Sequence, residues 1–517
     1  MSHVASSTFA ASNQNVEIQP SRESMESVIA RRLLRRRFLA VGTGLVAAAG
    51  GWSLSAGEPT KRPALLVAPR GIDQLATRSK MTLQLSGTLR VPHPDPAAKK
   101  PAREAEVKAE STVEFEERIA MDKAGSAVAA ARNYSQAKVS TWVAGNASSH
   151  ELRDACRDVR VLLHEGVWQQ YSPTQQMTAK EVDLLRMPIN TVVVDQLLPT
   201  EPVKPDSQWN PSERVLAELF SLEAVHSSTV QAYVTKVENG AASIEFDGAI
   251  DGTAGGVSTK MNIKGNLTAR LGTACAVVTW VGLSMTEVRA ISQAEPGFTL
   301  TALVKLVRQE ELNACLDVTV DELQSLAAND DGGRWMLQVI STAGRYQMLA
   351  DRRWHTIIDS GEESILRLVE NNNVVAQCNI TRLPKLPAGQ QLTMEAMQED
   401  VKRSLGTNFV AFAEVAEKLN STGHRLLRIV ADGTSGEVPV RWIYCHLSDD
   451  TGRRVSLVFT MSGESVESFG AADDQMTGSF EMLPEPSTSA EPTPAPKAEG
   501  ASVESAKVTK PESKSIR

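Results

Sequence analysis

The chain has eight histidines and five cysteines, the residue types best suited to metal binding and redox chemistry. Their spacing limits both kinds of chemistry. No two histidines stand two or four residues apart, so neither a strand nor a helix presents a pair of zinc ligands. The absence of a Cys-x-x-Cys pair argues against a zinc knuckle and a redox motif. We therefore predict no metal site and no cofactor. We expect free thiols, with any disulfide pairing left open, at Cys156, Cys275, Cys315, Cys378 and Cys445.

The chain also lacks the short motifs that position a nucleophile or a phosphate. It has no G-x-S-x-G elbow, no G-x-x-x-x-G-K-[ST] loop and no G-x-G-x-x-G after a strand. We predict that it is not an enzyme. The alternative is a hydrolase with dispersed residues, in which His355 or His446 would stand beside a nucleophile or carboxylate in a cleft.

Two predicted strands mix cationic, aromatic and imidazole side chains. Three such residues are consecutive on one strand, and three alternate along the other, which places the latter on one face. The competing interpretation is structural: a solvated edge strand with charged gatekeepers, and a strand face packed with aromatic rings. Our candidate binding surface comprises Arg353, Trp354, His355, Trp442, Tyr444 and His446.

The elements that must position these residues fall into two β-rich regions. In the first, residues 64–310, a capping box at Thr178 and Glu181 and a cap at Ser212 predict two short helices. Asn239-Gly240 predicts a tight hairpin turn. We predict a curved antiparallel sheet, or half-barrel, with helices laid across it. Its strands are predicted from alternating polarity at 81–91, 105–119, 138–143, 229–238, 241–251, 257–268 and 274–289.

The second region, residues 335–483, follows a linker predicted at 311–334. Thr393 is expected to cap a long amphipathic helix that reaches Val415, and a last helix is expected at 464–482. Turns are predicted at Asn371-Asn372 and Asp432-Gly433. The predicted fold class is therefore α+β with two β-rich domains. The strands of the second are expected at 335–340, 347–357, 364–369, 373–380, 424–431, 437–447 and 454–461.

The N-terminal region, residues 1–63, contains a predicted targeting signal. Arg35 and Arg36, with Phe38 and Leu39, precede a weakly apolar run rich in glycine and alanine. This pattern resembles a twin-arginine export signal. The resemblance implies the twin-arginine translocase as a partner during export and a final location in the periplasm or cell envelope. Because the run has about the length of one membrane crossing, an uncleaved anchor in the inner membrane is the alternative.

Composition excludes some partners. The chain has a net charge of −8 and only 5% aromatic residues, which disfavours both counterion-displacing and base-stacking contacts with nucleic acid. We predict no nucleic-acid partner. Residues 484–517 are rich in Pro, Ser, Ala, Glu and Lys, so we predict a disordered tail there.

Several segments also resemble known proteins. Residues 351–355, 365–369, 376–379 and 438–446 resemble a group of exported, uncharacterised proteins of planctomycete-type bacteria. The element order of 323–483 resembles the PsbP-like α+β fold, and residues 64–310 are loosely similar to periplasmic lipoprotein-carrier half-barrels. PsbP-like domains are typically binding or assembly modules, so the resemblance implies interaction.

From these patterns we predict an exported, non-catalytic binding or assembly protein of the cell envelope. Its expected partner is an envelope protein or lipid that the sequence does not identify. The alternative is a carrier that holds an apolar ligand, a lipid or lipoprotein, in the N-terminal half-barrel.

Overall fold

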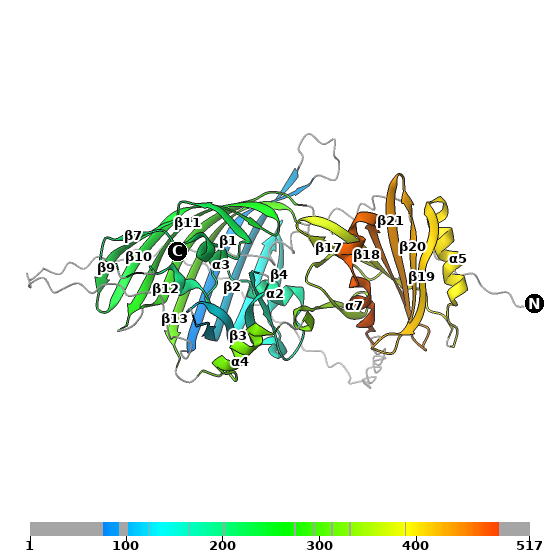
Figure 1. Ribbon diagram of the computed structural model, residues 1–517, viewed down its shortest axis with the longest axis horizontal. Coiled ribbons are helices and arrows are strands. Elements are labelled where there is room, and N and C mark those ends of the chain that lie inside the picture. Colours follow the sequence, from blue (N-terminus) through cyan, green and yellow to red (C-terminus); the bar gives the residue numbers. More distant parts are fainter. Residues whose placement is uncertain are drawn as a thin grey trace, which may run out of the picture. The chain divides into compact units, whose positions relative to one another are not determined.

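The computed structural model describes residues 76–92, 102–123, 125–164, 166–199, 201, 203–272, 276–292, 295–311, 314–329, 332–387 and 389–484. All elements described below belong to the unit that ends at Met482. Most of the described residues lie in antiparallel strands of three sheets, with short helices packed on them (Figure 1). The predicted β-rich α+β class is confirmed.

The largest sheet has thirteen strands in the order β6-β5-β3-β2-β1-β13-β12-β11-β10-β9-β7. β4 and β8 pair with β3 and β10 off this path. The first long strand pairs with the last, because β1 lies between β2 and β13. The strands are β1 Ala76–Pro92, β2 Ala102–Met121, β3 Ala127–Val143, β4 Asn146–Glu151, β5 Asp158–His164, β6 Val167–Tyr171, β7 Gln208–Trp209, β8 Ala224–Ser228, β9 Gln231–Glu238, β10 Ala241–Ala254, β11 Val257–Leu271, β12 Ala276–Arg289 and β13 Gly297–Glu310.

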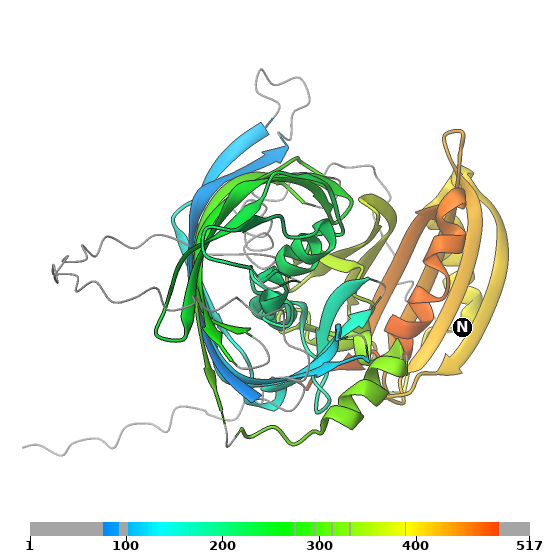
Figure 2. The ribbon, with the colours of Figure 1, turned by 60° about the vertical axis from the view of Figure 1, so that its left-hand side comes forward.

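One face of this sheet is buried and the other is solvated. Along β11, residues alternate strictly between buried and exposed from Val257 to Asn266, as period-two patterning requires. Figure 2 shows the sheet curving around short helices on its concave side. These helices are α2 (Ala179–Leu185) and α3 (Glu213–Phe220), whose apolar residues join the core of the inner face.

Two smaller sheets follow. The three-stranded sheet has the order β14-β15-β23, with strands Leu337–Ser341, Tyr346–Ala350 and Glu481–Met482. The seven-stranded sheet has the order β16-β17-β18-β22-β21-β20-β19. Its strands are β16 Trp354–Asp359, β17 Glu363–Glu370, β18 Asn373–Leu383, β19 Phe409–Leu419, β20 Arg425–Ser435, β21 Val438–Ser448 and β22 Arg454–Ser462.

Helices cover both faces of the seven-stranded sheet. On one face, α5 (Met394–Leu405) packs Val401 and Leu405 in one cluster with Trp442 and Tyr444 of β21. On the other face, α6 (Val466–Phe469) and α7 (Ala472–Gly478) join a separate core that contains the interleaved β21 residues. Strand alternation therefore divides this sheet between two cores.

The helix caps and the hairpin turn that depend only on neighbouring residues are confirmed. Thr178 and Glu181 form a reciprocal capping box at the start of α2, and Ser212 caps α3. Asn239 and Gly240 both have positive φ, 49° and 72°, as a tight hairpin turn between β9 and β10 requires.

The prediction of a long helix from Thr393 to Val415 is wrong. Helix α5 ends at Leu405 because Gly406 adopts φ 55° and ψ −124°, which is outside the helical region. Residues 409–419 form strand β19 instead. In the same way, the single helix predicted at 464–482 is two short helices, interrupted at Gly470 with φ 57°, followed by β23.

Other boundaries also differ. The strand predicted at 347–357 is two strands, β15 and β16, because a turn separates them. Asp432-Gly433 lies within β20, and the hairpin turn follows at Gly436, which has φ 62°. The predicted linker contains helix α4 (Val320–Ala328), and β13 is among the strands that were not predicted.

Candidate functional site

Strand β19 is the edge of the seven-stranded sheet, and among the described strands it pairs only with β20. Its length sets it apart. The strands that end the two larger sheets elsewhere, β6, β7 and β16, have five, two and six residues, whereas β19 has eleven. Natural proteins usually keep edge strands short or covered, because unpaired N–H and C=O groups recruit other strands. The β19 edge is therefore the first candidate for a functional surface.

The second half of β19 offers a regular edge. Register shifts follow Phe409 and Phe412, but residues 414–419 pair with β20 without interruption. Within this segment Val415 is 39% exposed and Leu419 is 70% exposed. Exposed apolar side chains beside an unpaired backbone are what an added strand buries.

A row of alternating charges reaches this edge from α7. Asp473 accepts a hydrogen bond from Arg428 at 2.6 Å, and Arg428 pairs with Glu414 at 2.7 Å. Lys418 pairs with Asp474 at 2.7 Å. Burial alone would lower the pKa of Arg428. The hydrogen bond to Asp473 and the negative charge of that residue outweigh burial, so the pKa of Arg428 is raised. The row thus ends at β19 with one carboxylate and one ammonium group, four residues apart.

A polar pocket of about 620 Å³ lies at the end of the same sheet. It is lined by the last residues of β19, by the turns 422–425 and 448–453, and by Glu481 of β23. Two ion pairs lie in its wall: Arg425 bonds Glu417 and Arg453 bonds Asp449, each at 2.7 Å.

His424 is the one imidazole that lines this pocket. The Thr422 hydroxyl lies 2.6 Å from the Phe480 carbonyl and 2.8 Å from His424 Nδ1. The same hydroxyl also lies 2.9 Å from Asn420 Oδ1, so its single proton has two oxygen acceptors besides the ring nitrogen. Burial, the largest cause, lowers the pKa of His424.

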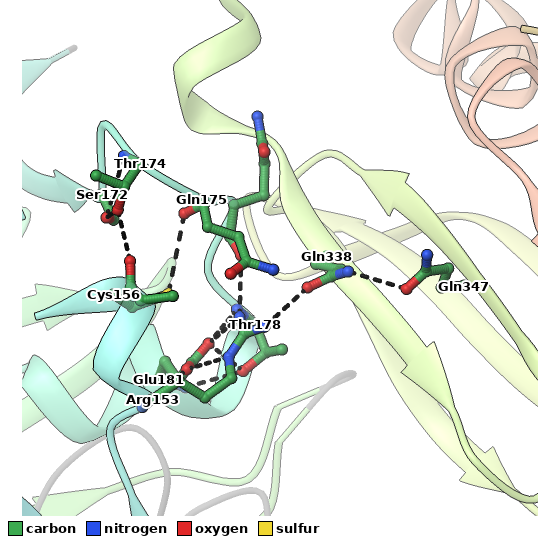
Figure 3. A network of polar contacts seen from close by, with 11 residues as sticks. Arg153, Cys156, Ser172, Thr174, Gln175, Thr178, Glu181, Gln338 and Gln347 are labelled. Carbon is green, nitrogen blue, oxygen red and sulfur yellow. Dashed lines mark hydrogen bonds and ion pairs between the residues drawn. The ribbon is translucent and has the colours of Figure 1, made fainter.

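A chain of polar contacts runs from helix α2 to the pocket, and Figure 3 shows its part from Glu181 to Gln347. Arg153 holds both oxygens of Glu181, at 2.6 and 2.7 Å, and donates to Gln338 Oε1 at 3.2 Å. Gln338 donates to Gln347 at 3.0 Å, and Gln347 donates to Glu481 at 2.6 Å. Burial would raise the pKa of Glu181, but the Arg153 and Thr178 hydrogen bonds outweigh it and lower the pKa. The chain therefore begins at an ionised, paired carboxylate and ends at the pocket.

The inner face of the thirteen-stranded sheet also carries buried charge. Arg132 bonds Glu117 at 2.7 Å and Thr191 at 3.0 Å. Arg308 bonds Asp195 at 2.8 Å, and that carboxylate also accepts the backbone N–H of Val278. Thr191 and Asp195 belong to the segment between α2 and α3, which contains a 3-10 helix at Val194–Leu197. These contacts fix that segment to the concave face, because a buried charge that lost its partner would be costly.

The six residues predicted as a binding surface do not form one exposed patch. Trp354 is buried in the core with α6 and α7, whereas Trp442 and Tyr444 are buried under α5, in a different cluster. His446 is completely buried, and burial together with Arg454 lowers its pKa to about 4.

Arg353 and His355 are half-buried. Arg353 is paired with Asp351 and Glu370 at 3.1 and 3.0 Å. The export-signal residues Arg35, Arg36, Phe38 and Leu39 lie outside the described residues, as do Cys275 and all but the first residue of the predicted tail.

Sequence reasoning missed both β19 and His424. The spacing of three between Phe409, Phe412 and Val415 indicated a helix, and the two bulges that produce this spacing in a strand leave no sequence signature. The Asn420, Thr422 and His424 turn is brought to the pocket by contacts with residues 477–480, more than fifty positions away.

Within the described part of the chain, no three His, Cys, Asp or Glu side chains are placed to hold a metal ion. The helices of that same part include none with the length and hydropathy of a membrane span.

No family model matches this chain, and no curated protein matches it. Solved structures with some likeness include lipovitellin, titled for its lipid–protein interactions, with 9% identity and a TM-score of 0.27 over 47% of this chain and 26% of that chain. A protein from Bacteroides thetaiotaomicron has 10% identity and a TM-score of 0.21 over 29% and 48%. A BenF-like porin from Pseudomonas fluorescens has 8% identity and a TM-score of 0.12 over 75% and 98%. The chain matches less than half the length of the first two, and scores this low support no argument about function.

Proposed function

We propose that this chain is a non-catalytic binding or assembly protein of the cell envelope that engages another protein chain by strand addition at β19. The proposal depends on the length of this edge strand, eleven residues, because the other edge strands of the two larger sheets are short in the described part of the chain. In strand addition, backbone hydrogen bonds supply affinity, and side chains that alternate along the edge supply specificity. Val415 and Leu419 are the exposed apolar contacts available for it.

The pocket supports binding more than catalysis. A hydroxyl nucleophile must donate its hydrogen bond to the base that activates it. Here the Thr422 hydroxyl lies against two oxygen acceptors, Phe480 O at 2.6 Å and Asn420 Oδ1 at 2.9 Å, which compete with His424 Nδ1 for its proton. The arrangement holds a turn in place and leaves the His424 ring at the wall of the pocket, where a polar ligand group can contact it.

The envelope location rests on the twin-arginine pattern, and the division into 64–310 and 335–483 rests on element order and the PsbP-like resemblance. Replacing Arg35 and Arg36 with lysine is expected to retain the protein inside the cell, as measured by cell fractionation. Undiminished export of that double variant would contradict the location.

The strand-addition proposal is tested by placing a photo-crosslinking side chain at Val415 of β19. A matched control is Leu303 of β13, which is 37% exposed but is paired with Gln84 of β1 on one side and Ser284 of β12 on the other. We expect a discrete protein adduct, identified by mass spectrometry from cells, at Val415 and none at Leu303. Adducts at neither position, or equally at both, would refute strand addition at β19.

A second function, carriage of an apolar ligand, is favoured by the curved sheet. Its inner face is largely apolar, and among the described elements α2, α3 and the segment between them pack on it. Native mass spectrometry of protein purified without detergent should then show a bound lipid. A mass equal to that of the polypeptide alone would exclude this second function.

A further inference from the structure

We infer that the chain which adds to β19 is a second copy of this protein, paired antiparallel across a two-fold axis at Ala416. This inference rests on the proposed function, since it names the partner for the same edge. It is carried by the charge pattern of residues 414–418 and by the regular register of that segment.

Two-fold symmetry restricts the possible registers. In an antiparallel pair, directly opposed residues share a face of the sheet, so one residue must lie opposite its own copy. With Ala416 at that position, Glu414 of each copy faces Lys418 of the other, and the small Ala416 side chains meet at the axis. A single two-fold operation thus forms two oppositely charged cross-strand pairs.

The neighbouring registers lack this match. Centring on Glu417 would place that carboxylate opposite its own copy, and centring on Lys418 would oppose two ammonium groups. Centring on Val415 would place Glu414 opposite Ala416 and leave Lys418 without a facing carboxylate. Like charges directly opposed destabilise a strand pair, so the Ala416 register is the one that the sequence of β19 favours.

The surrounding charges extend the pattern across the axis. Within one copy, Arg428 already holds Glu414, and Asp474 already holds Lys418, each at 2.7 Å. A second copy would join these into a continuous row, in which Arg428, Glu414, the partner's Lys418 and the partner's Asp474 alternate in sign. Such a row is held in place on both sides, which lowers the entropy cost that weakens isolated surface pairs.

The test is a charge exchange on the purified full chain, with molar mass followed by sedimentation over a dilution series. The wild type should dimerise. Glu414→Lys and Lys418→Glu should each weaken the dimer at least roughly tenfold, because two attractive pairs become repulsive. An equimolar mixture of the two single variants should form a heterodimer, since each contact is then one lysine against one glutamate.

Recovery on mixing separates pairing from misfolding, because a misfolded variant does not recover when a second variant is added. A wild type that stays monomeric at every concentration, or a mixture that stays monomeric, would overturn the inference. The proposed function would survive that result if the side chain at Val415 still crosslinks to a different protein. The proposed function itself fails if no adduct forms at Val415.

Discussion

His446 is the residue through which pH acts most clearly on this fold. Its ordinary pKa is near 6.5, and burial, with the charges of Arg454 and Arg425, lowers it to about 4 in the folded protein. The unfolded chain therefore binds more protons than the folded chain between these values. The contribution of His446 to stability is complete above pH 6.5 and is lost progressively as pH falls toward 4.

Replacing this residue in His446→Leu should remove that dependence. Between about pH 7.5 and about pH 5 the wild type should lose about 2 kcal/mol through His446 alone, and the variant should not. Urea unfolding at both pH values measures the difference. The exposed His226, replaced by leucine in the same way, is the control. An equal loss in wild type and His446→Leu would show that another group carries the pH dependence.

At this scale the sequence showed residue types but not their surroundings. Alternation along β21 placed Trp442 and Tyr444 on one face, and they do lie together, under α5. Whether that face met solvent or a helix depended on where α5 docks, which no local pattern encodes. His424 went unremarked because its setting comes from a turn, a distant hairpin and β23.

At the scale of elements, turns and caps were predictable because each depends on a few neighbouring residues. The end of α5 was not, because apolar residues continue at helical spacing past Leu405 and hid the change to a strand. Gly406 makes the change possible. Its φ of 55° with ψ of −124° is a conformation that L-residues with a Cβ rarely adopt.

Gly406→Ala should therefore destabilise the protein by on the order of 1–3 kcal/mol through backbone strain, although no atom lies within 4 Å of the added Cβ. Gly478, at the end of α7, has equally open surroundings without positive φ, so Gly478→Ala is the matched control. It should change the urea midpoint little. If the two substitutions had the same effect, the α5–β19 junction would not depend on backbone strain at Gly406.

For the molecule as a whole, the question is whether the thirteen-stranded and seven-stranded sheets unfold together. Arg352, in the turn between β15 and β16, donates to the carbonyls of Trp335 at 2.8 Å and of Gln170 on β6 at 2.6 Å. Its guanidinium also lies 5.3 Å from the centre of the Trp335 ring. Burial and the charge of Arg186 lower the pKa of Arg352 to about 9, which still leaves it cationic at neutral pH.

Arg352→Ala would remove these contacts and leave two partly buried carbonyls without this donor, at a cost of about 1–2 kcal/mol. Because the contacts join elements of different sheets, we expect one calorimetric transition in the wild type to separate into two in the variant. Arg353→Ala is the control, since Asp351 and Glu370, the partners of that side chain, lie in the same local hairpin region. It should keep a single transition. One transition in both variants would show that Arg352 does not couple the sheets and would point to the Arg153–Gln338 contact instead. Two transitions in the wild type would show that the two sheets unfold independently.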